Sequence, residues 1–259
     1  MKIAMLQMEI VAGDVAGNKN KGLALVEEAA DKADVIILPE IWTTGYALKN
    51  VAQAAEHIDG PLMTQLAGIA RKHHVNIIAG SVPVSRNGRT YNTTMVIDRQ
   101  GTIINSYEKV HLFSMYGEEH FFAPGTKLGL LSLDKMTAGV AICYDLRFPE
   151  LFRSLALQGA QAVFVPAGWP AARGHHWRTL VQARAIENHL YICAVNCVGE
   201  HKGSPFYGHS LLVDPEGVII AEGDDRETII YGEIDPARVA GARKDMLTFA
   251  DRRPDLYSC

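Results

Sequence analysis

A cysteine at position 143 has the sequence context of a nucleophile. It follows the apolar run 139–142, which predicts a buried strand, and precedes segment 144–150, which predicts a turn and then the start of a helix. A thiol in this position lies at the carboxyl end of a strand, where open α/β sheets bind ligands, and near helix amides, which lower thiol pKa values. Free cysteines are mostly inert and buried, so the position of Cys143 alone does not identify it as a nucleophile.

A glutamate follows a second predicted strand. Residues 35–38 are apolar, Pro39 removes an amide donor and ends the strand, and Glu40 comes next. Its apolar and aromatic neighbours are expected to raise its pKa, as a general base near neutral pH requires. The alternative is a solvated capping glutamate, since Glu is rarely buried without a partner.

A lysine ends a third predicted strand, within the apolar and aromatic segment 103–113. Lys109 is either a surface residue with an exposed ammonium or a buried cation, and a buried cation needs a carboxylate nearby. The acidic pair Glu118 and Glu119 can supply one. Together with Glu40 and Cys143, Lys109 would complete a site in which the thiol attacks, the carboxylate is the base and the ammonium stabilises an oxyanion.

Three segments carrying these residues, 38–40, 107–113 and 142–150, resemble the motifs of the nitrilase superfamily of carbon–nitrogen hydrolases, in the same order. The resemblance covers nearly the whole chain. It implies that Glu40 is the general base, Lys109 the oxyanion stabiliser and Cys143 the nucleophile. The second glutamate of the family falls near Glu118, with Glu119 as the alternative. The resemblance also implies a four-layer αββα sandwich, a homodimer, and chemistry that requires no metal or organic cofactor.

Segments 168–170, 176–177 and 183–188 are similar to the ω-amidase branch of that superfamily. This implies hydrolysis of the terminal amide of 2-oxo dicarboxylic acid monoamides such as 2-oxoglutaramate, with water as the second reactant. Nitrile or N-carbamoyl hydrolysis by the same three groups remains an alternative. A catalytically silent binding or scaffold protein is a further alternative, and the presence of all three groups argues against it.

The substrate of an ω-amidase carries a second, distal carboxylate. Arg173 is the best candidate to bind it, since guanidinium binds carboxylate in a bidentate manner. Further substrate-binding candidates are the backbone amide of Tyr144, the Trp169 wall, Tyr46 and His176. Two pairs are expected to be structural: Arg147 with Glu150, and Arg184 with Glu187.

Composition excludes several classes of protein. The 259 residues are 48% hydrophobic and 21% charged, which is an ordinary globular composition. A net charge of −4 provides no basic surface for nucleic acid or membrane, and no apolar run reaches the ~20 residues that span a bilayer. Four cysteines are too few for a disulfide scaffold, no zinc-binding spacing occurs, and the amino terminus lacks signal-peptide features. We expect a cytoplasmic protein.

Strand and helix patterns alternate along the chain and predict one α/β domain, residues 1–259, with mixed sheets and with 242–259 as a carboxyl-terminal extension. Cys193 and Cys197 are expected to share one face of a strand over 190–198, as packing residues, and Cys259 is expected to be idle. Segments 208–214, 218–222 and 228–234 are expected to form a meander. Helices are expected over 18–32, 61–74, 149–158 and 175–188.

Overall fold

Two β-sheets packed face to face form the centre of the structure, a computed structural model that describes residues 1–257. The first sheet has the order β15 (Thr228–Glu233), β1 (Lys2–Gln7), β2 (Val35–Ile37), β3 (Asn76–Ile78), β5 (Arg89–Ile97), β4 (Val82–Arg86), with β6 (Ile103–Glu108) also paired to β5. The second has the order β14 (Ile219–Glu222), β13 (Leu211–Val213), β10 (Tyr191–Val195), β9 (Ala162–Pro166), β8 (Met136–Val140), β7 (Gly129–Leu133). A separate pair is formed by β11 (Glu200–His201) and β12 (Ser204–Pro205).

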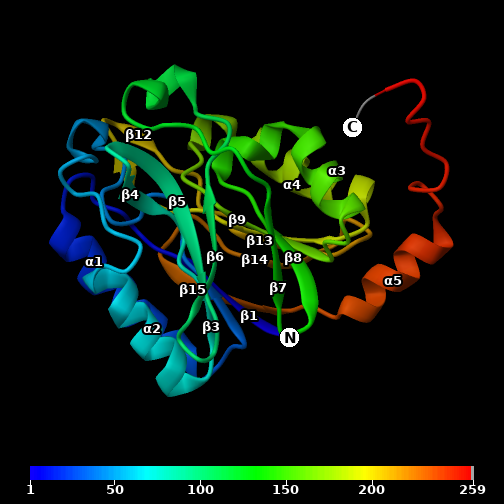
Figure 1. Ribbon diagram of the computed structural model, residues 1–259, viewed down its shortest axis with the longest axis horizontal. Helices are drawn as coiled ribbons and strands as arrows, with labels where there is room; N and C mark the ends of the chain where they lie inside the picture. The colour runs from blue at the N-terminus through cyan, green and yellow to red at the C-terminus, as the bar shows by residue number, and fades with distance from the viewer. Residues whose placement is uncertain (258–259) are drawn as a thin grey trace.

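Helices cover the outer faces of both sheets (Figure 1). Helices α1 (Val15–Ala30) and α2 (Pro61–His73) lie on the first sheet, and α3 (Pro149–Leu157) and α4 (Gly174–Asn188) lie on the second. Short 3-10 helices connect the layers: η1 (Leu48–Asn50), η2 (Ser114–Tyr116), η3 (Glu118–His120), η4 (Cys143–Arg147) and η5 (Ala171–Arg173). The four layers and the mixture of parallel and antiparallel pairs confirm the predicted αββα sandwich.

Alternation along strand β1 explains why both faces of the first sheet are covered. Successive side chains of a strand point to opposite faces. Ile3 and Met5 belong to the apolar cluster that includes the second sheet, while Ala4 and Leu6 belong to the cluster that includes helices α1 and α2. All four are fully buried. Because β1 is apolar on both faces, both faces of its sheet have to be covered, and the sheet forms a middle layer of the sandwich.

Local signals set the starts of the helices. The Asp14 side chain caps α1 by accepting a hydrogen bond from the amide of Gly17 at 3.0 Å. Helices α2 and α3 begin with Pro61 and Pro149, at the position where the missing amide of proline costs no hydrogen bond. The predicted helices are confirmed to within three residues at each end.

Two expectations about strands are wrong. The segments after residue 208 do not form a meander, because β14 ends in the second sheet and β15 crosses over to pair antiparallel with β1 of the first. Cys193 and Cys197 do not share a face, since β10 ends at Val195 and the two thiols lie in different apolar clusters. Both are buried packing residues. Cys259 lies outside the described residues.

The carboxyl-terminal part follows β15 and runs along the side of the sandwich (Figure 1). Helix α5 (Pro236–Asp245) begins before residue 242 and continues past it, so regular structure extends into the segment expected to be an extension. Its Asp235 side chain caps the helix by accepting from the amide of Ala237 at 2.9 Å. Within residues 1–257, none of the helices has the length and apolar character that crossing a membrane requires.

Candidate active site

Three chain segments bring Glu40, Lys109 and Cys143 together at one end of the sandwich. Glu40 lies three residues beyond β2, Lys109 directly follows β6, and Cys143 lies three residues beyond β8. The first two strands belong to one sheet and the third to the other. The amide of Glu40 donates to the carbonyl of Ala167, which follows β9 of the second sheet, at 3.3 Å. The site is therefore built between the sheets.

The backbone presents Cys143 on a tight turn. Its φ of 44° lies in the left-handed region, which residues with a side chain rarely adopt and which is common at functional sites. Asp145 fixes the turn, because its carboxylate accepts from the amide of Ile142 at 2.8 Å, the hydroxyl of Tyr107 at 2.7 Å and the amide of His111 at 3.1 Å. The short η4 helix, rather than a full helix, therefore begins at the thiol.

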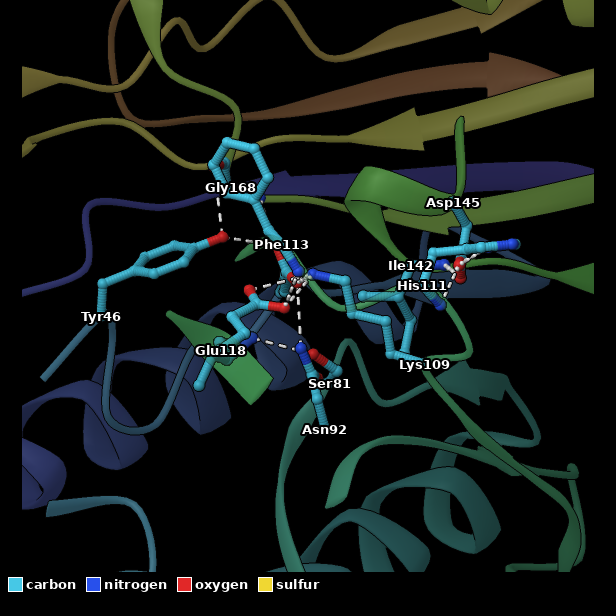
Figure 2. A network of polar contacts seen from close by, with 12 residues as sticks. Tyr46, Ser81, Asn92, Lys109, His111, Phe113, Glu118, Ile142, Asp145 and Gly168 are labelled. Atoms are coloured by element: carbon cyan, nitrogen blue, oxygen red, sulfur yellow. Dashed lines mark hydrogen bonds and ion pairs between the residues drawn. The ribbon is translucent and has the colours of Figure 1, made fainter. Parts of the chain in front are cut away.

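Lys109 is a fully buried cation between two carboxylates. Its Nζ lies 2.7 Å from Oε1 of Glu40 and 3.0 and 2.9 Å from Oε1 and Oε2 of Glu118, and all three side chains have zero exposure. Figure 2 shows Glu118 and Lys109 meeting at the centre of this network. The amide of Phe113 donates to Oε2 of Glu118 at 2.9 Å. Glu119 is instead exposed, so Glu118 is the second glutamate that contacts Lys109.

Glu40 accepts hydrogen bonds from four sides. Lys109 and the side-chain amide of Asn92 donate to Oε1, the latter at 3.0 Å. The hydroxyl of Tyr46 and the backbone amide of Gly168 donate to Oε2 at 2.7 and 3.0 Å. Neither Asn92 nor Gly168 is predicted from the sequence to contact Glu40. An asparagine inside the strand pattern 91–98 was the available signal for the first, because Asn is disfavoured in strands.

The electrostatics of the site correct one expectation. Burial by itself would raise the pKa of Glu40, but the charge and hydrogen bond of Lys109, with help from Tyr46, outweigh it and hold that pKa below its usual value. Burial and the negative charge of Glu40 raise the pKa of the Cys143 thiol well above its usual value. The expected rise in the pKa of Glu40 is wrong, since its neighbours are hydrogen-bond donors and a cation rather than apolar groups.

The neighbouring charges also shift the pKa values of Lys109 and Glu118. Burial would lower the pKa of Lys109, but the two carboxylates raise it, so the ammonium stays protonated. Burial, together with the charge of Glu40, raises the pKa of Glu118 despite the attraction of Lys109. The resting site therefore holds a neutral thiol beside an ion-paired carboxylate.

A narrow pocket leads to the thiol. Its lining comprises aromatic, small and cationic residues: Tyr46, Phe113, Cys143, Tyr144, Arg147, Gly168, Trp169, Pro170 and Arg173. The predicted substrate-binding residues Tyr46, Tyr144, Trp169 and Arg173 all line it. His176 does not, and is an exposed residue whose Nδ1 lies 3.3 Å from the guanidinium of Arg147.

Arg147 differs from its expected role. Its guanidinium stacks over the ring of Trp169 at 4.8 Å and lies near His176, so it does not form the expected pair with Glu150. Arg147 and Arg173 both line the pocket, and burial and the nearby charge of Arg173 lower the pKa of Arg147. The expected pair of Arg184 and Glu187 is present, at 3.0 Å. Within residues 1–257, no group of three or more His, Cys, Asp or Glu side chains is arranged to hold a metal ion.

Comparison with known proteins agrees with this geometry. Residues 2–244 match the model of the carbon-nitrogen hydrolase family. The chain belongs to the carbon-nitrogen hydrolase family. It is 41% identical to the 2-oxoglutaramate amidase of Bacillus subtilis (strain 168) over 255 residues, covering 98% of each chain. It is 30% identical to the omega-amidase NIT2 of Homo sapiens over 267 residues, covering 99% of this chain and 96% of the relative.

A solved structure with a similar fold carries a covalent adduct on its active-site cysteine. A variant of the amidase from Nesterenkonia sp. AN1 superposes with a TM-score of 0.85 and 27% identity, over 99% of this chain and 95% of the other. That structure shows covalent addition of the acetamide moiety of fluoroacetamide at the active-site cysteine. The predicted resemblance to the nitrilase superfamily is confirmed, and this chain is a carbon-nitrogen hydrolase.

Proposed function

We propose that this carbon-nitrogen hydrolase cleaves the terminal amide of small 2-oxo dicarboxylic acid monoamides, of the 2-oxoglutaramate type, to the acid and ammonia. The observation that carries the proposal is a pocket whose lining combines the thiol of Cys143 with two guanidinium-bearing residues, Arg147 and Arg173. A small amide that carries an anionic group at its other end fits this arrangement. The activities named for the two curated relatives are of the same kind.

In the proposed mechanism, Glu40 takes the proton of Cys143 while the sulfur attacks the amide carbon. The ammonium of Lys109 and the backbone amide of Tyr144 stabilise the oxyanion that forms. Glu40 returns the proton to the departing amine, which leaves as ammonia, and a thioester remains on Cys143. Glu40 then removes a proton from water, and the hydroxide attacks the thioester. The carbon–sulfur bond breaks, the acid product leaves, and the proton on Glu40 passes to the sulfur, which restores the thiol and the ionised carboxylate.

Glu118 supports this chemistry through Lys109. Because both of its oxygens contact Nζ of Lys109, it remains the counter-ion of the ammonium when the lysine turns from Glu40 to the substrate. Trp169 and Tyr46 would form the walls of the pocket, and Arg173 would bind the distal carboxylate. His176 would act through Arg147, since it lies outside the pocket lining.

The test is ammonia release by the purified protein from 2-oxoglutaramate, 2-oxosuccinamate, glutamine, a simple aliphatic amide and a nitrile. We expect fast release from the two 2-oxo acid amides, and none from the Cys143→Ala variant. Release from another amide or a nitrile alone would keep the three catalytic groups and overturn the substrate. Near-normal turnover by Cys143→Ala would overturn the mechanism.

The Arg173→Ala variant tests the carboxylate contact. A hydrogen bond to a charged group contributes roughly 1.5–3 kcal/mol, so KM for 2-oxoglutaramate should rise about 10- to 100-fold with a smaller change in kcat. Arg178→Ala is the matched control, because Arg178 is an exposed residue of α4 that pairs with Glu222 on the surface. An unchanged KM in Arg173→Ala would show that this arginine does not bind the carboxylate.

We also infer a single catalytic domain that works as a homodimer in the cytoplasm. Within residues 1–257, Cys143, Cys193 and Cys197 are free thiols, in keeping with a reducing compartment. Exposed apolar side chains on the outer helices and beyond α5, such as Leu157, Ile186 and Leu247, offer surface for a second copy. Sedimentation as a monomer at micromolar concentration would contradict the dimer, and recovery in a membrane or secreted fraction would contradict the location.

A further inference from the structure

The carboxylate of Glu40 already has a full set of hydrogen-bond donors. An ionised carboxylate offers about four lone-pair sites. Lys109 and Asn92 occupy those of Oε1, and Tyr46 and the amide of Gly168 occupy those of Oε2. The thiol of Cys143 feels the same carboxylate, because the negative charge of Glu40, after burial, raises the pKa of the thiol. A carboxylate so occupied is a weak base, and one donor has to leave before it can hold the proton of the thiol.

Three of the four donors are fixed in place. Gly168 donates through its backbone amide. Asn92 lies within β5, and its backbone carbonyl accepts a hydrogen bond from the amide of Lys109 at 2.9 Å. Tyr46 is 6% exposed and packs against the rings of Tyr116 and Phe206, with centroids at 5.5 and 5.7 Å. Burial and the charge of Glu40 raise the pKa of Tyr46 well above its usual value, so its hydroxyl stays a donor.

Lys109 is the donor that can turn away. Its ammonium has three N–H groups, and Glu118 binds it through both oxygens, so it keeps a counter-ion when it leaves Glu40. Figure 2 shows Tyr46 and Asn92 approaching the centre of the network from different sides, with the chain of Lys109 reaching in from a third. A carbonyl oxygen of the substrate close to Nζ would compete with Oε1 of Glu40 for the same N–H.

We propose that Asn92 and Tyr46 are positioning residues of the reaction, which hold Glu40 ionised and oriented until Lys109 turns to the substrate and frees Oε1 to accept the thiol proton. In that step the S–H bond of Cys143 breaks, its proton moves to Glu40, and the sulfur forms a bond to the amide carbon. Lys109 donates to the carbonyl oxygen as negative charge develops there. The inference rests on the proposed role of Glu40 as general base.

The experiment measures the pH dependence of kcat/KM in Tyr46→Phe and Asn92→Ala. Glu40 must be ionised to act, so activity is lost as pH falls through its pKa, and loss of a donor to the carboxylate raises that pKa. We expect the acid limb to move upward by about one pH unit in each variant, with a larger fall in kcat than rise in KM. The other titratable groups facing Glu40 are Lys109, Glu118 and the thiols of Cys143 and Cys197.

Matched variants away from the site separate this role from simple packing. Tyr191→Phe removes a buried hydroxyl, which accepts from the amide of Asp235 at 3.3 Å, and Asn76→Ala removes a buried amide at the other end of the sheet. Both should leave the acid limb in place. An unmoved acid limb in Tyr46→Phe and Asn92→Ala, or an equal shift in the matched variants, would overturn the proposal.

Alkylation of Cys143 by iodoacetamide supplies a readout that does not depend on amide hydrolysis. The rate, corrected with Cys143→Ala for reaction at other thiols, should show the same displaced acid limb in both site variants. Loss of hydrolysis of every amide, with the displaced alkylation profile retained, would overturn the proposed function and keep this inference. Alkylation profiles identical to that of the unchanged protein would overturn the inference itself.

Discussion

The same two strands carry a charge cluster at each end, and the two clusters differ in burial. Beyond the ends of β2 and β8 lie Glu40 and Cys143, with the fully buried Lys109 between two carboxylates. Before β2 lies Asp34, and before β8 lies Asp134. Arg99 contacts these two aspartates at 3.1 and 2.6 Å, and its side chain is 27% exposed.

The contrast shows what burial adds to an ion pair. Arg99 joins the two sheets at a surface, where water screens the charges and each pair contributes little free energy. Lys109 is removed from water, so its carboxylates are indispensable partners and its charge acts strongly on the neighbouring thiol and base. We therefore expect that the Arg99 cluster can be replaced with small loss and that the Lys109 cluster cannot. The predictions below test this difference.

The largest effect is expected for Lys109→Met. This change leaves Glu40 and Glu118 facing each other without a cation, and removal of one partner from a buried ion pair costs about 3–5 kcal/mol. Activity should be lost, and urea denaturation should show the lower free energy of unfolding. A loss of less than 1 kcal/mol would mean that the buried cluster behaves like the surface one.

An intermediate effect is expected on the pH dependence of kcat/KM in the unchanged protein. Because its neighbours lower the pKa of Glu40, the base stays ionised down to lower pH than an ordinary glutamate, whose pKa is about 4.3. The acid limb of kcat/KM should therefore lie below pH 4.3, with circular dichroism showing folded protein at each pH. An acid limb near pH 6 would instead support the apolar environment expected from the sequence.

The ionised carboxylate of Glu40 also makes the free energy of unfolding fall as pH falls, in the same direction as the activity. A carboxylate whose pKa is depressed in the folded protein stabilises the fold above its unfolded pKa and loses that contribution as pH falls through the folded value. Glu118, whose pKa is raised, stabilises the fold in its protonated form and opposes this trend. The free energy of unfolding should therefore fall less steeply with decreasing pH than it would if Glu40 were the only group with a shifted pKa.

The smallest effect is expected for Arg99→Met. Its partners Asp34 and Asp134 are 40% and 32% exposed, so the loss should be about 1 kcal/mol or less and should shrink at high salt. Activity should remain within twofold of the unchanged protein. Loss of several kcal/mol in denaturation would show that joining the sheets at this end matters as much as the buried cluster.

Local sequence patterns were enough to predict most of the elements and to single out Glu40, Lys109 and Cys143 as candidate catalytic residues. Each of the three stands at the end of an apolar strand pattern, and such patterns depend on neighbours a few residues apart. The family resemblance of the three segments pointed to Glu118 in the same way. Helix starts at Pro61 and Pro149 are equally local signals, and the structure agrees with them.

The surroundings of these residues depend on contacts between distant parts of the chain. The pKa of Glu40 is lowered by Lys109, 69 positions away, and its carboxylate is held by Asn92 and Gly168, 52 and 128 positions away. The same holds for the crossing of β15 to the first sheet and for the stacking of Arg147 on Trp169. Local patterns report which residues are buried, but the direction of a pKa shift depends on which groups the fold places within a few ångströms.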